Sequence, residues 1–100
     1  MTMIQILIQR LAQEILQELF DKNQKQYKKI EKAIDELTQK GLSASNIKKL
    51  TGTKNIFRKR AGRWRILFTV EGEIFKIWII AMEKGTKQDY LKWIFYIQKT

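Results

Sequence analysis

The sequence has 100 residues and lacks cysteine, histidine and proline altogether. Without cysteine, neither a disulfide nor a thiolate metal site can form. Without histidine, the chain lacks the usual zinc ligand, the usual general base near neutral pH and every nucleophile that a histidine activates. No clustered Asp/Glu pattern suited to magnesium is present either. We therefore expect neither a metal ion nor a cofactor.

Acidic residues are also scarce. Ten Asp and Glu stand against 20 Lys and Arg, which gives a formal net charge of +10. A charge of this sign attracts polyanions or acidic proteins. The 44% hydrophobic content is enough for the core of one domain spanning residues 1–100. The apolar start, Met3–Ile8, is too short to span a membrane and has no signal-peptide cleavage pattern, so we expect a cytoplasmic protein without a membrane partner.

Apolar periodicity predicts one strand and two helices in the first half of the chain. Alternation indicates a short strand over Met3–Ile8, and helical spacing indicates helices over Leu11–Phe20 and Gln24–Lys40. Gly41 lies where a glycine ends a helix. We expect one further helical turn at Ile47–Leu50.

The second predicted helix carries a cluster of lysines opposite its apolar stripe. Charged residues opposite such a stripe are the default for a surface helix, which favours a solvated face over a track for RNA. Much of the positive charge is then diffuse attraction. The lysines concerned are Lys25, Lys28, Lys29 and Lys32.

From about Asn55 the apolar period changes to two, and two glycine-containing turns predict consecutive hairpins. Glu71-Gly72 is one expected turn and Ala61-Gly62 the other. Pairing outward from each turn defines the register. The predicted pairs are Val70–Glu73, Phe68–Phe75, Ile66–Ile77 and Trp64–Ile79 in one hairpin, and Arg60–Arg63, Arg58–Arg65 and Ile56–Leu67 in the other.

This register gathers basic side chains on one face of the sheet, away from the core. Guanidinium groups bind phosphate bidentately and aromatic rings stack on bases, so such a mixture suits a nucleic-acid chain. The alternative is a solvated face whose paired arginines cost about 0.2–1 kcal/mol per pair. Lys59 falls on the core face, from which we expect it to reach solvent. The predicted RNA- or phosphate-binding residues are Arg58, Arg60, Arg63, Lys76 and Trp78.

The stretch KKLTGTKNIFRKRAGRWRILFTVEGEIFKIWII, with two helices before it, resembles the RelE/ParE superfamily of toxins from toxin–antitoxin pairs. The matching elements are Lys48–Gly52, a strand over Phe57–Arg60, the turn at Gly62, the aromatic–arginine pair Trp64-Arg65 and the apolar strand Ile66–Phe68. The tight motif covers about residues 48–70. The resemblance implies an α+β fold in which two N-terminal helices pack on a twisted, mostly antiparallel four-stranded sheet, followed by a short C-terminal helix.

The superfamily contains more than one activity. One branch is a ribosome-dependent mRNA endonuclease, which would act here by metal-free attack of the 2′-hydroxyl and so inhibit translation. Another branch inhibits DNA gyrase without being a nuclease, and a third alternative is an inactive member that only binds its antitoxin. The resemblance implies an acidic antitoxin as partner, ribosome and mRNA as further partners of a nuclease, and allows an oligomeric assembly with the antitoxin.

The resemblance also implies roles for individual residues. Arg65 follows the aromatic and matches a phosphate clamp, and Tyr90 matches a tyrosine that holds or orients the substrate. Arg58 and Arg60 match basic positions on the preceding strand. The arginine face favours the nuclease alternative.

The family usually has an arginine a few residues before this tyrosine, and the segment EKGTKQDY has none. Arginine is a poor base because its pKa lies above about 12, whereas nearby positive charge lowers the pKa of a lysine. We therefore expect Lys84, with Lys87 second, to take the catalytic place beside Arg65 and Tyr90. The alternative is Glu83, the nearby carboxylate, which would serve as the base if its pKa were raised. The missing arginine itself favours the non-nuclease alternatives.

The C-terminal segment has a simpler interpretation as well. Thr86 followed by Asp89 predicts a helix start, and the helix would carry an apolar stripe that includes Tyr90. On this pattern Tyr90 is a core or interface residue. The width of the apolar surface indicates that a partner covers it. The stripe consists of Tyr90, Trp93, Ile94 and Ile97, broadened by Leu91 and Phe95.

Overall fold

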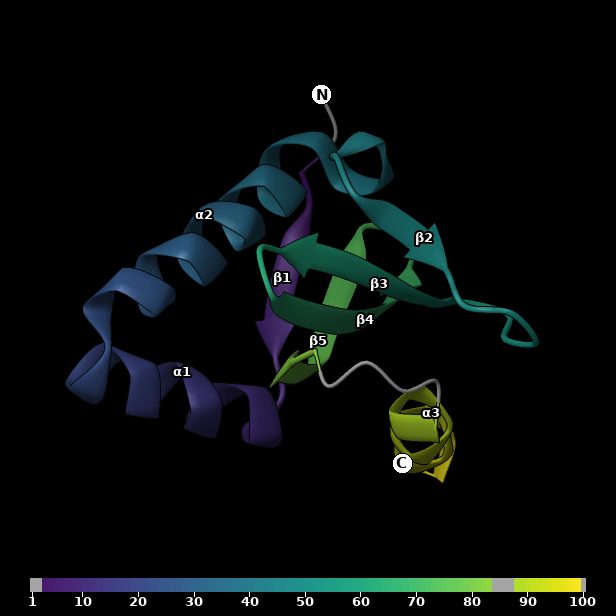
Figure 1. The fold of residues 1–100 in the computed structure, drawn as a ribbon. Coiled ribbons are helices and arrows are strands. Elements are labelled where there is room, and N and C mark those ends of the chain that lie inside the picture. Colours follow the sequence, from purple (N-terminus) through teal and green to yellow (C-terminus); the bar gives the residue numbers. More distant parts are fainter. Residues whose placement is uncertain (1–2, 84–87, 100) are drawn as a thin grey trace.

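The computed structural model describes residues 3–83 and 88–99, with the side chains of residues 88 and 89 left aside. These residues form one mixed sheet with helices on both faces (Figure 1). None of the helices in the described ranges is long and apolar enough to cross a membrane. In chain order the elements are β1 (Gln5–Ile8), α1 (Arg10–Lys22), α2 (Gln24–Lys40), the 3₁₀ turn η1 (Gly41–Ser43), β2 (Ile47–Lys49), β3 (Ile56–Ala61), β4 (Trp64–Glu71), β5 (Ile74–Met82) and α3 (Gln88–Lys99).

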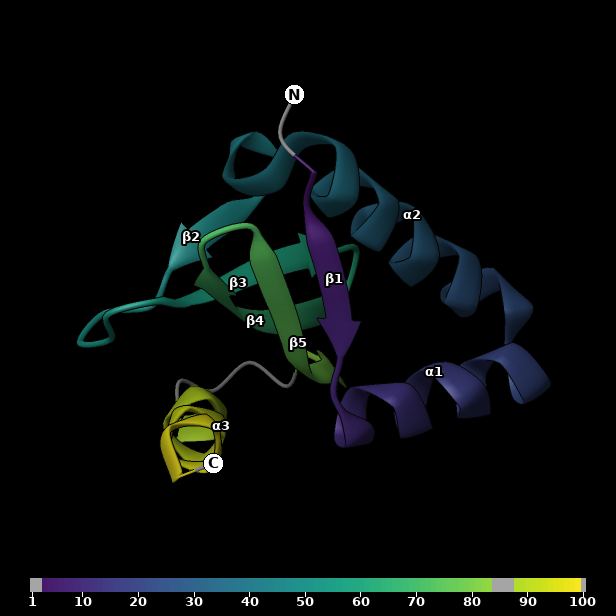
Figure 2. The same cartoon turned by 180° about the vertical axis from the view of Figure 1, so that it is seen from behind.

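The sheet has the strand order β1-β5-β4-β3-β2. Among the described strands, β1 and β5 pair in parallel and the other neighbours pair antiparallel; Figure 2 shows β1 and β5 side by side from behind. The predicted α+β class is confirmed, with five strands in place of four. The additional strand is β2, so the helical turn expected at Ile47–Leu50 is wrong. An isolated helical turn is costly to form, whereas Ile47–Lys49 gains ladder hydrogen bonds by pairing with Phe57–Lys59 of β3.

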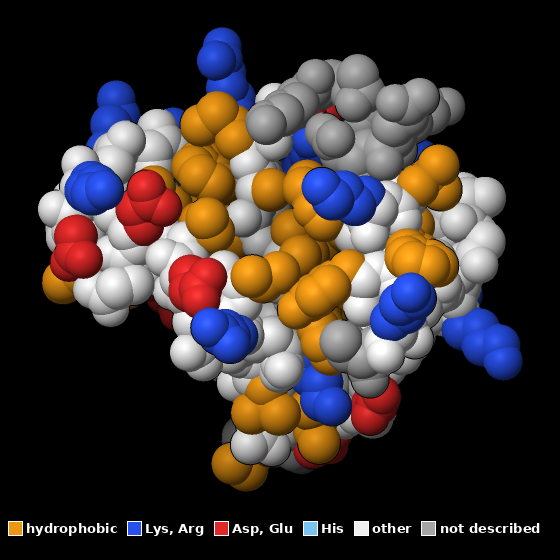
Figure 3. Space-filling model, turned by 90° about the horizontal axis from the view of Figure 1, so that it is seen from below, with side chains coloured by type: hydrophobic (Ala, Val, Ile, Leu, Met, Phe, Trp, Pro, Cys, Tyr) orange, Lys and Arg blue, Asp and Glu red, His pale blue; other side chains and the backbone are white. Residues whose placement is uncertain are grey.

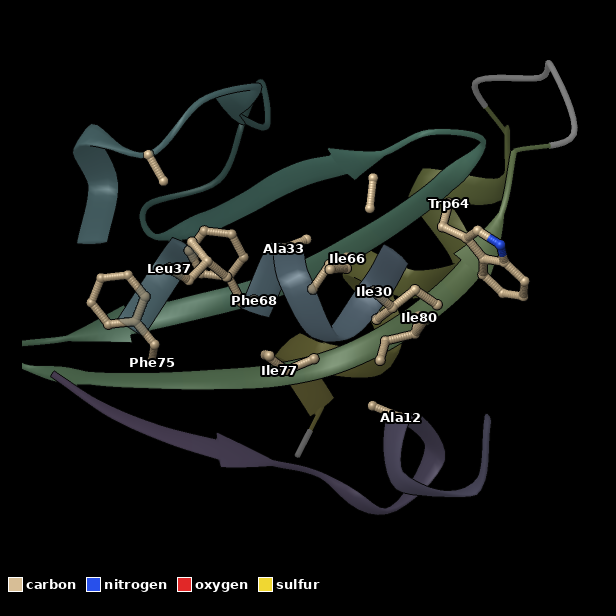
Figure 4. Packing of buried hydrophobic residues seen from close by; sticks show 12 residues of the cluster. Ala12, Ile30, Ala33, Leu37, Trp64, Ile66, Phe68, Phe75, Ile77 and Ile80 are labelled. Carbon is tan, nitrogen blue, oxygen red and sulfur yellow. The ribbon is translucent and has the colours of Figure 1, made fainter. Parts of the chain in front are cut away.

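Helices α1 and α2 cover one face of the sheet. Ile30, Ala33 and Leu37 recur along α2 at helical spacing and are buried. Figure 4 shows these residues packed against the strands, and Ala12 of α1 belongs to the same cluster. The strands contribute Trp64, Ile66, Phe68, Phe75, Ile77 and Ile80.

Both hairpin turns lie one residue later than the sequence predicts. Their central residues are Gly62-Arg63 and Gly72-Glu73, because Ala61 pairs with Trp64 and Glu71 with Ile74. The two glycines take φ values of 64° and 61°. A two-residue turn with glycine in its first central place matches the twist of the strands, which decides the register. The observed pairs are Arg60–Arg65, Arg58–Leu67 and Ile56–Thr69 in one hairpin, and Val70–Phe75 and Phe68–Ile77 in the other.

The predicted pairs are thus wrong by two residues, whereas the faces are mostly correct. A shift of two keeps each side chain on its face of a strand. Beyond Phe68 a bulge in β5 adds Trp78 between the pairs Phe68–Ile77 and Leu67–Ile79. Ile80 consequently joins the core under α1 and α2, and Ile79 faces the other side.

The expectation that Lys59 reaches solvent is wrong, because the residue is buried. Its side chain is 2% exposed, and its Nζ lies 2.8 Å from Oε1 of Glu36. Nζ also donates to the carbonyl of Ser45 at 2.6 Å, and Ser45 donates its backbone N–H and hydroxyl to the same carboxylate. One buried ammonium thereby joins α2, the loop after η1 and β3.

We expect this network to make the free energy of unfolding fall as the pH is lowered. The hydrogen bond from Lys59, followed by those from Ser45, lowers the pKa of Glu36 from 4.5 to about 2. A depressed folded-state pKa contributes stability above pH 4.5 that is lost as the pH falls toward 2. Urea unfolding between pH 6 and 2 should therefore show a steeper loss for the wild type than for Glu36→Gln/Lys59→Met, in which both charges are removed together.

The control is Glu18→Gln, at an exposed carboxylate on α1. It should keep the pH dependence of the wild type. Equal pH dependence in the wild type and the double variant would show that the network does not control acid stability.

Candidate functional site

Helix α3 covers the face of the sheet that was predicted to carry exposed arginines. Ile97 of α3 is buried with Ile56, Leu67 and Ile79 in a second core cluster. The predicted C-terminal helix is thus present, and its expected start at Thr86 lies outside the described residues. Its apolar stripe packs inward, while Leu91 and Phe95 point outward and are exposed.

Arg65 lies under this helix and is 1% exposed. Its guanidinium carbon is 4.6 Å from the ring centre of Tyr90 and 5.5 Å from that of Trp93. Its Nη2 donates to the carbonyl of Met82 at 3.5 Å, which is long for a hydrogen bond. No ion pair within the described ranges involves Arg65. Among the described side chains, the charge is therefore buried against two aromatic rings and not against a carboxylate.

Three buried polar atoms in this region have no hydrogen-bond partner: Nε of Arg65, Nε of Arg58 and the hydroxyl of Tyr90. Arg58 and Arg65 are on neighbouring strands and the same face, since Arg65 pairs with Arg60 two residues along β3. Buried polar groups are normally satisfied, so three in one region indicate a site for a missing acceptor. A phosphate oxyanion is the acceptor that guanidinium groups bind best.

The site is closed in this structure. Because Arg65 is almost fully buried, a phosphate reaches its guanidinium only after the Tyr90 or Trp93 side chain moves. Trp93 is the residue of this site that the sequence did not assign to it. The signal was its spacing, three residues after Tyr90 on the same helical stripe.

The other predicted residues do not form one continuous face with Arg65. Arg60 lies at the edge, half exposed and 3.4 Å from Glu83. Arg63 was expected on the arginine face but is exposed in the β3–β4 turn. Lys84 and Lys87 lie outside the described residues. Among the described side chains, no three carboxylates gather in a way that could bind a metal ion.

Lys76 and Trp78 line a separate groove of about 470 Å³, together with Lys54 and Asn55. The lining includes neither Arg58 nor Arg65. Trp78 donates its indole N–H to the hydroxyl of Thr69 at 2.9 Å, so its polar atom is already satisfied. The predicted arginine–aromatic face is therefore divided in two, because α3 packs over the sheet between its ends.

No protein-family model and no curated protein matches the sequence. The fold, however, is similar to solved toxin structures. The YoeB dimer from Staphylococcus aureus has a TM-score of 0.69 at 19% identity, over 81% of this chain and 98% of that one. The RelE–RelB complex from Pyrococcus horikoshii OT3 has a TM-score of 0.69 at 22% identity, over 86% of this chain and 100% of the matched chain. The YoeB/ParE toxin from Agrobacterium tumefaciens has a TM-score of 0.68 at 9% identity, over 80% of this chain and 99% of the matched chain.

This chain has the RelE/ParE toxin fold. The resemblance noted in the sequence is thereby confirmed at the level of the fold, which is what similarity at such low identity establishes. Within the RelE/ParE fold of this chain, the arginine after the aromatic and the C-terminal tyrosine are in contact, as Arg65 and Tyr90. Their chemical roles remain predictions.

The burial of Arg65 changes what its substitution should do. Arg65 faces away from the main core, but its side chain is buried against Tyr90 and Trp93 beside the second core cluster, so the truncation Arg65→Ala would leave a cavity. Arg65→Met keeps most of the volume and removes the charge. Burying an ion costs several kcal/mol, whereas a desolvated cation–π contact contributes about 2 kcal/mol, so the two rings offset only part of that cost. We expect the free energy of unfolding of Arg65→Met, measured in urea, to equal or exceed that of the wild type.

Arg63→Met, at the exposed turn, removes the same charge and should change stability by less than about 0.5 kcal/mol. A loss of more than about 2 kcal/mol in Arg65→Met alone would mean that the guanidinium stabilises the fold. Arg65 would then be a structural residue.

Proposed function

We propose that this protein is the toxin of a toxin–antitoxin pair and acts as a ribosome-dependent mRNA endonuclease. The observation that supports this most strongly is the buried Arg65, which contacts Tyr90, lies near Arg58 and has an Nε without a hydrogen-bond partner and no ion pair among the described side chains. Such an arrangement is costly for a protein that only has to fold. It is useful if a phosphate arrives, because preorganised donors in a dry site stabilise developing negative charge.

In the proposed reaction, the 2′-hydroxyl of a nucleotide attacks its own 3′-phosphate. A base takes the hydroxyl proton, the phosphorus passes through a pentavalent state, and the 5′-oxygen of the next nucleotide leaves with a proton from an acid. The products are a 2′,3′-cyclic phosphate and a 5′-hydroxyl. Each positioned proton-transfer group contributes about 10²–10⁴-fold to the rate.

The residues divide this work according to their chemistry. Arg65 and Arg58 would hold the phosphate and stabilise its added charge, and the Tyr90 hydroxyl would donate to a phosphate oxygen. Lys84 is proposed for proton transfer, with Lys87 as the second choice. Arg60 would contact the chain at the edge of the site.

An antitoxin is the proposed protein partner. The RelE–RelB complex shows that a structural neighbour assembles with such a partner. This chain also has an apolar cleft of about 220 Å³ between α1 and α3, lined in part by Leu11, Ile15 and Trp93. Figure 3, seen from the side of these two helices, shows hydrophobic side chains gathered between them. An acidic segment with apolar side chains would complement both this cleft and the net charge of +10.

One observation favours the second candidate function, a toxin that is not a nuclease. Arg65 is covered by Tyr90 and Trp93, so the closed conformation cannot bind phosphate there. The missing arginine in EKGTKQDY points the same way. Inhibition of DNA gyrase, or binding of an antitoxin alone, is the activity that would then remain.

The deciding experiment maps mRNA 5′ ends in a purified translation reaction. Wild-type protein should produce new ends at decoding-site positions, and only when ribosomes are present. Arg65→Met should lower cleavage by at least about 10²-fold, because it removes the cation that stabilises the transition state. Tyr90→Phe keeps the ring that packs on Arg65 and removes only the hydroxyl, so its loss of activity would be chemical.

Lys92→Met is the matched control, since this exposed residue lies on α3 close to Tyr90. It should cleave like the wild type. Intact mRNA at an excess of folded wild-type protein would contradict the nuclease proposal. A gyrase supercoiling assay with the same preparation would then test the alternative.

A further inference from the structure

A second basic region lies in a cleft of about 640 Å³, largely on the other side of the sheet from the buried Arg65 guanidinium. Helix α2 forms one wall, and β3 with the turn at Gly62 forms the other. The loop residues Ser45 and Asn46 close one end. Its charged lining residues are Lys29, Lys32, Lys40, Lys59 and Arg60, with Asp35 and Glu36.

The cleft has an excess of positive charge. Five cations and two carboxylates line it, which leaves three net positive charges. Lys59 and Glu36 neutralise each other in their ion pair at 2.8 Å. Arg60 is partly offset by Glu83 at 3.4 Å. Lys29, Lys32 and Lys40 therefore carry most of the charge that is available to a ligand, against the single carboxylate of Asp35.

The lysines of α2 fall into two groups that the sequence did not separate. Lys29 and Lys32 line the cleft, whereas Lys25 and Lys28 do not. Lys29 also lies over the hairpin turn, where its Cδ is 4.0 Å from the place that a Cβ on Gly62 would occupy. Cations from a helix and from a hairpin thus converge on one concave surface, which a simple solvated face does not explain.

The chemistry of the lining indicates the ligand. None of the described residues that line the cleft is aromatic, and its apolar side chains are those of Ala33 and Ala61 alone. Single-stranded bases bind by stacking on aromatic rings, and protein partners anchor on large buried side chains. The described lining of the cleft offers neither aromatic rings for bases nor large apolar side chains for a protein partner. Lysines in a groove without rings suit phosphates whose bases face away, as they do in a double helix.

We propose that the cleft between α2 and β3 is a second binding site, specific for the phosphate backbone of double-helical RNA. The choice of RNA over another polyanion rests on the proposed function, whereas the phosphate chemistry rests on the cleft itself. The site holds structured RNA while the region of Arg65 and Tyr90 receives a single strand. It reads no sequence, since backbone contacts carry no base information.

The test measures binding of a fluorescein-labelled RNA duplex of about 16 base pairs, the length typical for double-strand binding domains, by anisotropy from 50 to 200 mM salt. Two double variants of α2 remove the same charge, Lys29→Ala/Lys32→Ala in the cleft and Lys25→Ala/Lys28→Ala outside it. Each lost phosphate contact lowers the slope of log K against log salt by about one. The cleft variant should lose about two units of slope and bind about tenfold more weakly at 100 mM salt, and the control variant should change little.

Equal losses in both variants would overturn the proposal, because they would mean diffuse attraction to the whole helix. A cleft variant that binds the duplex normally but loses binding of a poly-glutamate peptide would overturn it in favour of an acidic protein. All proteins carry Tyr90→Phe, and urea unfolding verifies that each variant is folded. Since no ribosome or cleavage enters the assay, failure of the nuclease proposal would leave this result unchanged.

Discussion

The pairing of β3 with β4 determines where the two buried cations of the sheet lie. Lys59 pairs with Ile66 and faces α2, while its neighbour Arg60 pairs with Arg65, which faces α3. Both Lys59 and Arg65 are almost fully buried, yet their surroundings differ in kind. Lys59 meets a carboxylate and a carbonyl, and Arg65 meets two rings. Within the described part of the chain, the same ladder therefore buries one cation with hydrogen-bonded partners and one whose Nε has none.

This difference separates structure from function. A buried ion is tolerated when its hydrogen bonds are made, and Lys59 makes them to Glu36 and Ser45. Among the described residues, Arg65 makes one long hydrogen bond, and both its Nε and the hydroxyl of Tyr90, whose ring it contacts, have no partner. Unsatisfied groups persist where they serve a ligand, because a protein without that need would lose them at a gain in stability. The unsatisfied charge is the better candidate for chemistry.

The sequence predicted the face of the sheet on which each side chain lies better than it predicted the strand register or the position of α3. Strict alternation assigns Arg58, Arg60 and Arg65 to one face whichever glycine turn is used, and that assignment holds. Ala61-Gly62 and Gly62-Arg63 differ by one residue, and only backbone conformation at Gly62 distinguishes them. The bulge at Trp78 has no local signal. Nor could period or charge reveal that α3 lies on the arginine face, since docking depends on contacts far apart in the chain.

Trp93 connects the site with the surface of the proposed partner. Its ring lies 5.5 Å from the guanidinium of Arg65, and the same residue lines the apolar cleft between α1 and α3. A partner side chain in that cleft would contact the ring that covers Arg65. Occupancy of the cleft and access to the guanidinium are thus coupled through one side chain, because a ring held by a partner cannot also move aside for a phosphate. If the proposed function holds, the burial of Arg65 is the means by which a bound antitoxin would keep the charge from RNA.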